Sequence, residues 1–241
     1  ARALGQMKLC DDFLVFLPYE GFDIWKYDTL TGEWTVDKIT ILNLYKNLGT
    51  AAYGNIAYSC VYFNGYLWMV TGCSDYLLKY NVNTGESELH KNDGDKYVYT
   101  YITADENKLY LLDNINNVIA ITNDGIDFSV IKIQTTLIKK YWNTENRTLC
   151  LFKAVLNVGN YIVLIPAFSD TFIKINKITN EQSVINTHFL DNADSCCNGY
   201  NPEYSYSIGV FATLNNHEFI VQRSHDGKAA VINVDDVNVE N

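Results

Sequence analysis

Short apolar runs recur in pairs along this 241-residue chain, and the two runs of each pair begin at a nearly constant distance. The first runs are FLVFLP from Phe13, YLWMVT from Tyr66, KLYLLD from Lys108, YIVLIP from Tyr161 and EFIVQR from Glu218. The second runs begin ten or eleven residues later, at Ile24, Leu77, Val118, Phe172 and Ala229. Because five pairs keep the same spacing, the chain is predicted to consist of five structural repeats.

Each repeat is predicted to form four antiparallel strands, a to d, with the paired runs as strands b and c. Ahead of one b run, the stretch SCVYFNGY places a strand before Asn64-Gly65, which is a strong signal for a tight hairpin. After the c runs, a turn leads to a last short strand: EWTVDKI from Glu33, ESELHK from Glu86, FSVIKI from Phe128 and QSVINT from Gln182. The repeat unit is therefore an a-b-c-d sheet with short connections.

The turn between strands c and d is written almost identically in three repeats. It reads YDTLTGE at Tyr27–Glu33, YNVNTGE at Tyr80–Glu86 and, less closely, INKITNE at Ile175–Glu181. Asn and Asp side chains hydrogen-bond their own backbone in turns, and glycine adopts a positive φ without strain. We therefore expect Asp28, Asn81 and Asn176 to cap these turns, and Gly32 and Gly85 to occupy their left-handed positions.

The b runs are apolar almost without alternation, which predicts that both faces of each sheet are covered. Radial packing of four-stranded sheets meets this requirement, so the predicted fold is an all-β propeller, a single domain over residues 1–241. The b runs begin 53, 42, 53 and 57 residues apart, close to the ~40–50 residues of known blades. Five blades are predicted, with part of a six- or seven-bladed ring as the alternative, because the last d strand, Val237–Asn241, is short and polar.

At the turns just described, the chain resembles the broad superfamily of Kelch-like and quinoprotein-like β-propellers, whose blades often end in Asp or Asn before a TGE-type turn. The segment LIPAFSDTFIKIN (Leu164–Asn176) is also similar to blades of bacterial propellers in which IP and a short loop precede an Ile-rich strand ending in Asn. The chain has neither the Gly-Gly pair of Kelch repeats nor the Trp-Asp pair of WD40 repeats. The resemblance implies a fold and specifies no activity.

The charge and composition exclude some classes of partner. A net charge of -10 opposes binding to a phosphate backbone, so nucleic acid is not predicted as a partner. The longest nearly uninterrupted apolar run, Tyr161–Phe168, is too short to span a membrane, and no membrane insertion is predicted. The six cysteines lack the spacing of a metal site and are expected to be mostly buried apolar residues. The sequence does not indicate a cellular compartment.

The b-to-c and d-to-a loops of a propeller leave the sheets at the same end, where ligands commonly bind. The aromatic and acidic side chains of these loops are predicted to bind a ligand: Tyr19, Phe22, Asp23, Asp75, Tyr76, Trp142, Phe168, Asp170, Asp194, Tyr200 and Tyr204. Tyrosine and tryptophan suit this role because they offer large contact areas with a polar tip. The alternative is that these aromatic side chains hold long loops against the sheets.

An acidic residue recurs in four b-to-c loops, at Asp23, Asp75, Asp170 and Asp226. These carboxylates could bind Ca²⁺ or serve as acid and base, or each could cap its own turn. Equivalent positions in several repeats favour the structural alternative. Lys26, Lys79 and Lys174 also share one position in their c strands, and they are predicted to lie at the surface with their stems along the sheet.

The favoured function is a non-enzymatic binding module that presents an acidic, aromatic-rich loop face to a protein, peptide or carbohydrate. No cofactor is predicted, apart from the Ca²⁺ alternative. A glycoside hydrolase or lyase that uses carboxylates on the same face is one alternative, and it would need two carboxylates about 5–10 Å apart. A structural segment of a larger scaffold protein is the other.

Overall fold

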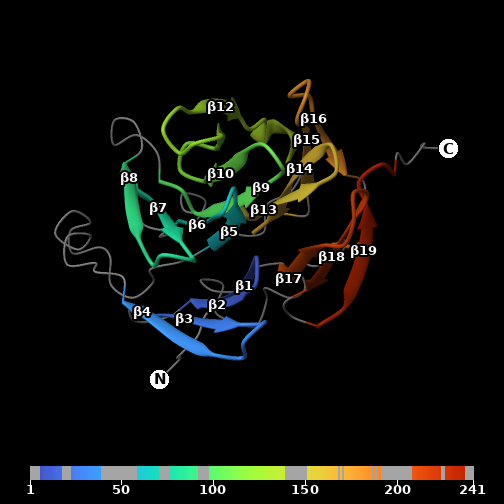
Figure 1. The fold of residues 1–241 in the computed structure, drawn as a ribbon. Coiled ribbons are helices and arrows are strands. Elements are labelled where there is room, and N and C mark those ends of the chain that lie inside the picture. Colours follow the sequence, from blue (N-terminus) through green and yellow to red (C-terminus); the bar gives the residue numbers. More distant parts are fainter. Residues whose placement is uncertain are drawn as a thin grey trace, which may run out of the picture. The chain divides into compact units, whose positions relative to one another are not determined.

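The protein is described by a computed structural model, in which five antiparallel sheets follow one another along the chain (Figure 1). The residues described are 6–17, 23–38, 59–70, 76–91, 98–138, 151–167, 169, 171–185, 187, 189–190, 208–223 and 226–236. Within the described residues, the one helical element is the short 3-10 turn η3 (Thr135–Leu137). No helix in the described ranges is long and apolar enough to cross a membrane.

Four sheets contain four strands, and in the fifth sheet three strands lie within the described residues. The first sheet comprises β1 (Gln6–Cys10), β2 (Phe13–Leu17), β3 (Asp23–Asp28) and β4 (Trp34–Lys38). The second comprises β5 (Ser59–Phe63), β6 (Tyr66–Val70), β7 (Tyr76–Asn81) and β8 (Ser87–Lys91). The third comprises β9 (Tyr101–Ala104), β10 (Leu109–Asp113), β11 (Val118–Thr122) and β12 (Ser129–Lys132). The fourth comprises β13 (Phe152–Val158), β14 (Tyr161–Pro166), β15 (Phe172–Asn176) and β16 (Gln182–Ile185), and the fifth β17 (Ile208–Thr213), β18 (Glu218–Arg223) and β19 (Ala229–Asn233).

The strands of each sheet lie in chain order, each hydrogen-bonded to the next, as predicted for the blades of a propeller. The all-β fold class and its five blades are thus confirmed. The predicted fifth d strand, Val237–Asn241, lies outside the described residues.

The turn between strands c and d has the same hydrogen bonds in its three copies. Asp28 Oδ1 accepts bonds from the backbone N–H groups of Leu30 at 2.8 Å and Thr31 at 3.0 Å. Asn81 Oδ1 and Asn176 Oδ1 each accept the two equivalent bonds, at 2.9 to 3.1 Å. The bonds from the Thr31 and Leu30 backbone lower the pKa of Asp28 below its ordinary value. The predicted turn chemistry is confirmed.

Each of these turns also needs one residue in the left-handed region. Gly32 has a φ of 76° and Gly85 a φ of 75°, an ordinary conformation for glycine. In the third copy, Asn180 takes the same position with a φ of 60°. Asparagine tolerates this region better than most residues, which explains why TNE can replace TGE.

Burial of the b strands differs between the middle and the end sheets. In β6, β10 and β14 nearly every side chain is buried, as the uninterrupted apolar runs predict. In β2 and β18 buried and half-buried side chains alternate instead. Every second side chain of β2 and β18 is thus only half-buried, so these two strands are less completely covered than their apolar runs predict.

The chain divides into two compact units, each of which has its own core. The first unit contains Ala1–Asp113 and Ala120–Val130, and the second contains Asn114–Ile119 and Ile131–Asn241. A single domain over residues 1–241 stays a prediction.

In the first unit, apolar side chains fill the space between neighbouring sheets. One cluster joins Val15 and Ile24 of the first sheet to Met69 and Leu78 of the second. The other face of the second sheet contributes Trp68 to a cluster with β9 and β10. Neighbouring sheets therefore pack face to face through their apolar side chains, as blades do.

In the second unit, the fourth and fifth sheets also pack face to face. The rings of Phe172 and Phe219 lie 5.8 Å apart and tilted. Lys153 Nζ donates a 2.6 Å hydrogen bond to the backbone carbonyl of Ile208, and Thr213 Oγ1 donates one of 2.8 Å to that of Asn157. Burial lowers the pKa of Lys153, whose amine reaches the neighbouring sheet through an otherwise apolar contact.

Candidate interaction surfaces

Two of the eleven predicted ligand-binding residues, Asp23 and Tyr76, lie within the described residues. Both begin a c strand, and both are half-buried. They pair in register with Lys38 and Lys91 of the adjoining d strands. The two c strands therefore begin one residue earlier than predicted, and both residues lie in a strand and not in the b-to-c loop. The other nine predictions fall outside the described residues: Tyr19, Phe22, Asp75, Trp142, Phe168, Asp170, Asp194, Tyr200 and Tyr204. Ligand binding by this loop face stays a prediction.

The recurring acidic position is best seen at Asp226. Its Oδ1 accepts bonds from the backbone N–H of Lys228 at 3.1 Å and from Arg223 Nε at 3.0 Å. A second bond joins Arg223 Nη2 to Asp226 Oδ2. Asp226 therefore stabilises its own turn, which favours the structural alternative for this residue.

Two of the other recurring acidic residues, Asp75 and Asp170, fall outside the described residues. The Asp226 turn therefore does not test whether these carboxylates bind Ca²⁺ together. Within the described ranges, no three His, Cys, Asp or Glu side chains lie close enough together to share a metal ion. Ca²⁺ binding at the loop face stays a prediction.

The three repeated lysines behave differently, and the predicted surface position is wrong for Lys26. The Lys26 side chain is buried, and its Nζ lies 2.8 Å from the carbonyl oxygen of Val82 and 2.7 Å from Asp37 Oδ2. Lys174 Nζ donates to the carbonyl of Val234. Val82 and Val234 each directly follow the Asn that closes the c strand of the next sheet, so both lysines bind the next turn.

Lys79, at the same repeat position, remains near the surface. Its Nζ lies 3.5 Å from Glu88 Oε2 and 4.2 Å from the centroid of the Tyr66 ring. An exposed pair of this kind adds little stability, so of the three repeated lysines Lys26 and Lys174 are the two that link neighbouring sheets.

Asp37 joins Lys26 to a second buried group. The Tyr80 hydroxyl, on β7 of the second sheet, donates a hydrogen bond to Asp37 Oδ2. Burial raises the pKa of Tyr80, and the bond to Asp37 adds to the shift. The tyrosine therefore stays neutral and donates, while the carboxylate balances the lysine charge.

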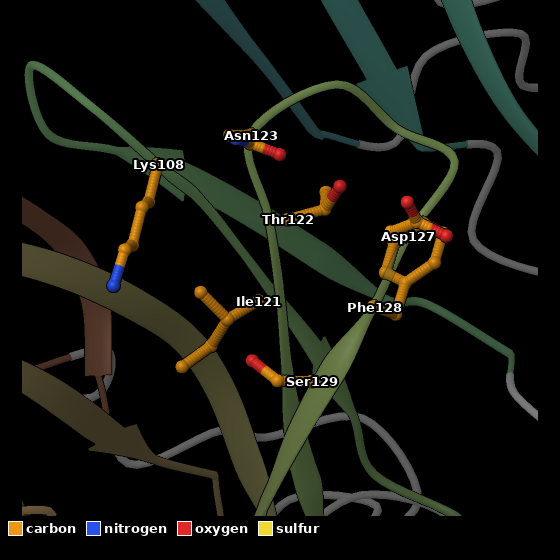
Figure 2. Close-up of a pocket in the computed structure, with 7 residues that line it drawn as sticks. All are labelled: Lys108, Ile121, Thr122, Asn123, Asp127, Phe128 and Ser129. Carbon is orange, nitrogen blue, oxygen red and sulfur yellow. The ribbon is translucent and has the colours of Figure 1, made fainter.

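A small pocket lies at the end of the third sheet opposite to its b-to-c loop, where strands a and b and strands c and d are joined. Its volume is about 370 Å³, and it is lined by Lys108, Ile121, Thr122, Asn123, Asp127, Phe128 and Ser129. Figure 2 shows Lys108 and Asp127 on opposite sides of the strand that carries Ile121 and Thr122. The size is near the lower limit for small-molecule sites, about 300–1,000 Å³.

The turn beside this pocket is held by its own side chains. Asp124 Oδ1 accepts bonds from the backbone N–H groups of Ile126 at 2.9 Å and Asp127 at 3.1 Å, which lower the pKa of Asp124. Thr122 Oγ1 accepts a bond from Gly125 N at 2.9 Å. The pocket is thus formed by a turn that departs from the TGE pattern. The departure from the TGE pattern after Thr122 is the signal in the sequence that could have indicated this pocket.

A second hollow, of about 310 Å³, lies in the second unit between Gly159–Tyr161, Asn216, His217 and Asp235. His217 Nδ1 and Asp235 Oδ2 are 2.6 Å apart, and both side chains are largely exposed. Solvent screening leaves such a pair little energetic effect, and its geometry provides no nucleophile or enclosed substrate position.

One face of the first sheet carries apolar side chains on all four of its strands. Two rows of paired residues cross its four strands: Met7, Phe16, Trp25 and Val36 in one row, and Leu9, Leu14, Tyr27 and Trp34 in the other. Residues paired across strands point to the same face, so all eight apolar side chains share it. We call it the β1–β4 face.

Five members of the β1–β4 face are strongly exposed. Met7, Leu9, Trp25, Trp34 and Val36 retain between 41% and 63% of their accessible surface. The ring of Trp34 lies against Phe16 and Tyr27, with centroids 5.3 and 5.1 Å apart. A contiguous exposed apolar surface of this kind is unusual on a folded protein, and the sequence alone did not identify it.

Comparison with known proteins supports the fold. No protein-family model matches the chain, and no curated protein matches its sequence. A streptogramin B lyase structure is similar with a TM-score of 0.59 and 14% identity, over 96% of this chain and 69% of the lyase chain. The WD40 repeats of RRP9 give a TM-score of 0.64 at 11% identity, over 97% and 61% of the two chains. The N-terminal domain of Nup159 gives 0.56 at 9% identity, over 96% and 60%.

These similarities place the chain in the β-propeller class of folds and show nothing more specific at such low identities. The chain spans about three fifths of the length of the last two structures. Membership of the Kelch-like group stays a prediction.

Proposed function

We propose that this chain is a non-enzymatic interaction scaffold whose partner is a protein. The observation that carries the proposal is the β1–β4 face, where eight apolar side chains form one surface and five are strongly exposed. Aromatic side chains such as Trp25 and Trp34 are typical anchors of protein interfaces. The WD40 similarity supports the proposal, because it concerns a fold that carries binding surfaces on rigid sheets.

The rigid turns support the same function. Side-chain caps at Asp28, Asn81 and Asn176 fix the c-to-d connections, so the sheets can present a surface with little ordering cost on binding. Binding of a peptide or carbohydrate at the loop face remains part of the proposal as a second surface. The hydrolase or lyase alternative has no described carboxylate pair in its favour.

A peptide array and a glycan array, each probed with the purified 241-residue protein, test the proposal. Three proteins are compared: wild type, Trp34→Glu on the β1–β4 face, and Tyr200→Ala with Trp142→Ala on the loop face. We expect peptide binding that Trp34→Glu reduces at least tenfold, because a charge replaces an exposed apolar anchor. Thr35→Glu is the matched control, since Thr35 is exposed on the same strand and points to the other face.

Peptide binding that Trp34→Glu leaves unchanged would refute the role of the β1–β4 face. Glycan binding lost only in the loop double variant would assign the function to the loop face instead.

A further inference from the structure

The second hollow described above, which we call the His217 hollow, is formed by three short segments of the second unit. They are the connection of β13 to β14, the connection of β17 to β18, and the segment that follows β19. The hollow therefore lies at the end of these sheets opposite to the b-to-c loops. It contains none of the residues that the sequence predicts to bind a ligand. Its volume is about 310 Å³, and its lining residues are Gly159, Asn160, Tyr161, Asn216, His217 and Asp235.

Two of these connections approach each other closely. Two residues, Gly159 and Asn160, connect β13 to β14, whereas the four residues Leu214–His217 connect β17 to β18. The longer connection reaches the shorter one, so that a Cβ on Gly159 would lie 2.1 Å from the backbone oxygen of Asn216. Glycine leaves room for this contact, and residue 159 therefore sets the position of Asn216 in the hollow.

Hydrogen bonds fix the backbone of both connections. Lys177 N donates to the Asn160 carbonyl at 2.9 Å, and Val234 N donates to the His217 carbonyl at 2.8 Å. The side chain of Asn215 braces the longer connection, because its Oδ1 accepts a 2.8 Å bond from His217 N. The hollow is thus preformed, and binding in it requires little ordering of the backbone.

The side chains of the hollow offer hydrogen-bonding groups of both kinds. Within the described residues, the side-chain amides of Asn160 and Asn216 have no hydrogen-bond partner, and each offers two donors and an acceptor. His217 Nδ1 lies 2.6 Å from Asp235 Oδ2. Because an ionised carboxylate can only accept, Nδ1 carries the proton of this bond, and Nε2 of the neutral ring is left as an acceptor.

The charges around the hollow narrow the class of ligand. The carboxylate of Asp235 and the net charge of -10 oppose an anion. Lys174 Nζ, 4.9 Å from the centroid of the Tyr161 ring, already donates to the carbonyl of Val234. Within the described residues, no third His, Cys, Asp or Glu joins His217 and Asp235 to hold a metal ion. A neutral ligand rich in hydroxyl groups fits best, because each hydroxyl both donates and accepts.

We infer that the His217 hollow binds one ring of a carbohydrate. The hydroxyls of a sugar ring match the amides and the imidazole, and its C–H groups match an aromatic ring such as that of the half-buried Tyr161. The volume is near the lower limit for small-molecule sites, about 300–1,000 Å³, which suits a single ring. This site is separate from the β1–β4 face and from the loop face, so the inference goes beyond the proposed function and does not depend on it.

Saturation-transfer-difference NMR of the 241-residue protein tests the inference with the methyl glycosides of glucose, galactose, mannose and N-acetylglucosamine. Each glycoside is titrated to about 20 mM, because an open site for one ring is expected to have a dissociation constant of about 1 mM. We expect saturation transfer to at least one glycoside. Asn160→Ala and His217→Ala each remove hydrogen-bonding groups and should each weaken binding about fivefold.

Two further variants separate the hollow from other surfaces. Gly159→Ala keeps every other lining side chain but displaces Asn216, so it should also weaken binding about fivefold or more; Asn216→Ala replaces it if circular dichroism shows that it does not fold. Asn83→Ala is the matched control, since Asn83 is an exposed asparagine at the same end of the second sheet, and it should bind as wild type.

The absence of saturation transfer to all four glycosides overturns the inference. Binding that both Asn160→Ala and His217→Ala leave unchanged also overturns it, because the sugar then binds elsewhere. Trp34→Glu should leave glycoside binding unchanged, and a loss in that variant would move the site away from the hollow. The peptide array that tests the β1–β4 face is independent of these results, so either proposal can fail alone.

Discussion

Replacing Asp37 by Ala tests the buried link between the first two sheets. Asp37 Oδ2 lies 2.7 Å from Lys26 Nζ and accepts the Tyr80 hydroxyl. Without Asp37, the ammonium group of Lys26 keeps only the Val82 carbonyl at 2.8 Å, and the buried Tyr80 hydroxyl loses its acceptor. The substitution therefore leaves an uncompensated charge and an unpaired donor between two packed sheets.

The expected cost follows from the burial of the pair. Removing one partner of a buried ion pair costs about 3–5 kcal/mol. The Asp37 side chain is 25% exposed, against 7% for Lys26, so partial solvation reduces the expected cost to about 2–3 kcal/mol. For a protein of this size, that loss lowers the melting temperature by roughly 5–10 °C.

Urea unfolding followed by tryptophan fluorescence measures this loss. Trp25, Trp34 and Trp68 all belong to the first unit, so the signal mainly follows the sheets that Asp37 joins. Glu88→Ala is the matched control, since Glu88 is 66% exposed and lies 3.5 Å from Lys79; its expected cost is below about 0.5 kcal/mol.

A double variant, Lys26→Met with Asp37→Leu, separates charge from packing. It is expected to recover at least half of the loss, because an apolar pair removes the uncompensated charge. If Asp37→Ala costs no more than Glu88→Ala, the buried link does not exist in solution.

Three further predictions concern turns, close packing and thiols. Asn81→Ala removes two turn hydrogen bonds and should lower the free energy of unfolding in urea by about 1 kcal/mol. Asn83→Ala in the same turn should be nearly neutral. Equal costs for the two variants would contradict the capping role of Asn81. Gly125→Ala would place Cβ 2.5 Å from Trp68 Cζ3, whereas Cβ on Gly65, with a similar φ, meets nothing within 4 Å. Gly125→Ala should lower the free energy of unfolding by about 3 kcal/mol and Gly65→Ala by about 1 kcal/mol. Equal losses of stability on thermal melting would show that Trp68 does not contact Gly125. Burial raises the pKa of the Cys10 and Cys60 thiols from 9.0 to about 12. The folded state therefore favours their protonated form, and stability should fall as the pH rises from about 9 to 12. Peptide mapping after alkylation at about pH 8 should find both thiols modified only in urea, and rapid modification of the native protein would contradict their burial.

The repeat and its turns could be predicted from the sequence because both depend on local chemistry. The spacing of the apolar runs determines which strands pair, and an Asn or Asp before a TGE-type turn satisfies the turn by itself. Asp28, Asn81 and Asn176 confirm this in three separate sheets.

Features that depend on a neighbouring sheet could not be predicted in the same way. Lys26 and Lys79 have the same position and similar flanking residues, yet only Lys26 is buried, because Asp37 and the Val82 carbonyl lie within its reach. The apolar run of β2 resembles that of β14, but one face of the first sheet is exposed. A single sequence encodes which side chains are apolar, whereas their burial depends on which surface lies opposite.

The central claim is that the β1–β4 face is an open apolar surface, and hydroxyl-radical footprinting of the wild-type protein tests it most directly. The chain contains two methionines, Met7 on this face and the buried Met69 at the equivalent position of the second sheet. Trp34 on this face and the buried Trp68 give a second comparison of an exposed with a buried side chain of one type. Met7 and Trp34 should be oxidised quickly, and Met69 and Trp68 slowly, because only the first two side chains are exposed. Oxidation of Met7 and Trp34 as slow as that of Met69 and Trp68 would show that the β1–β4 face is covered and would contradict the account.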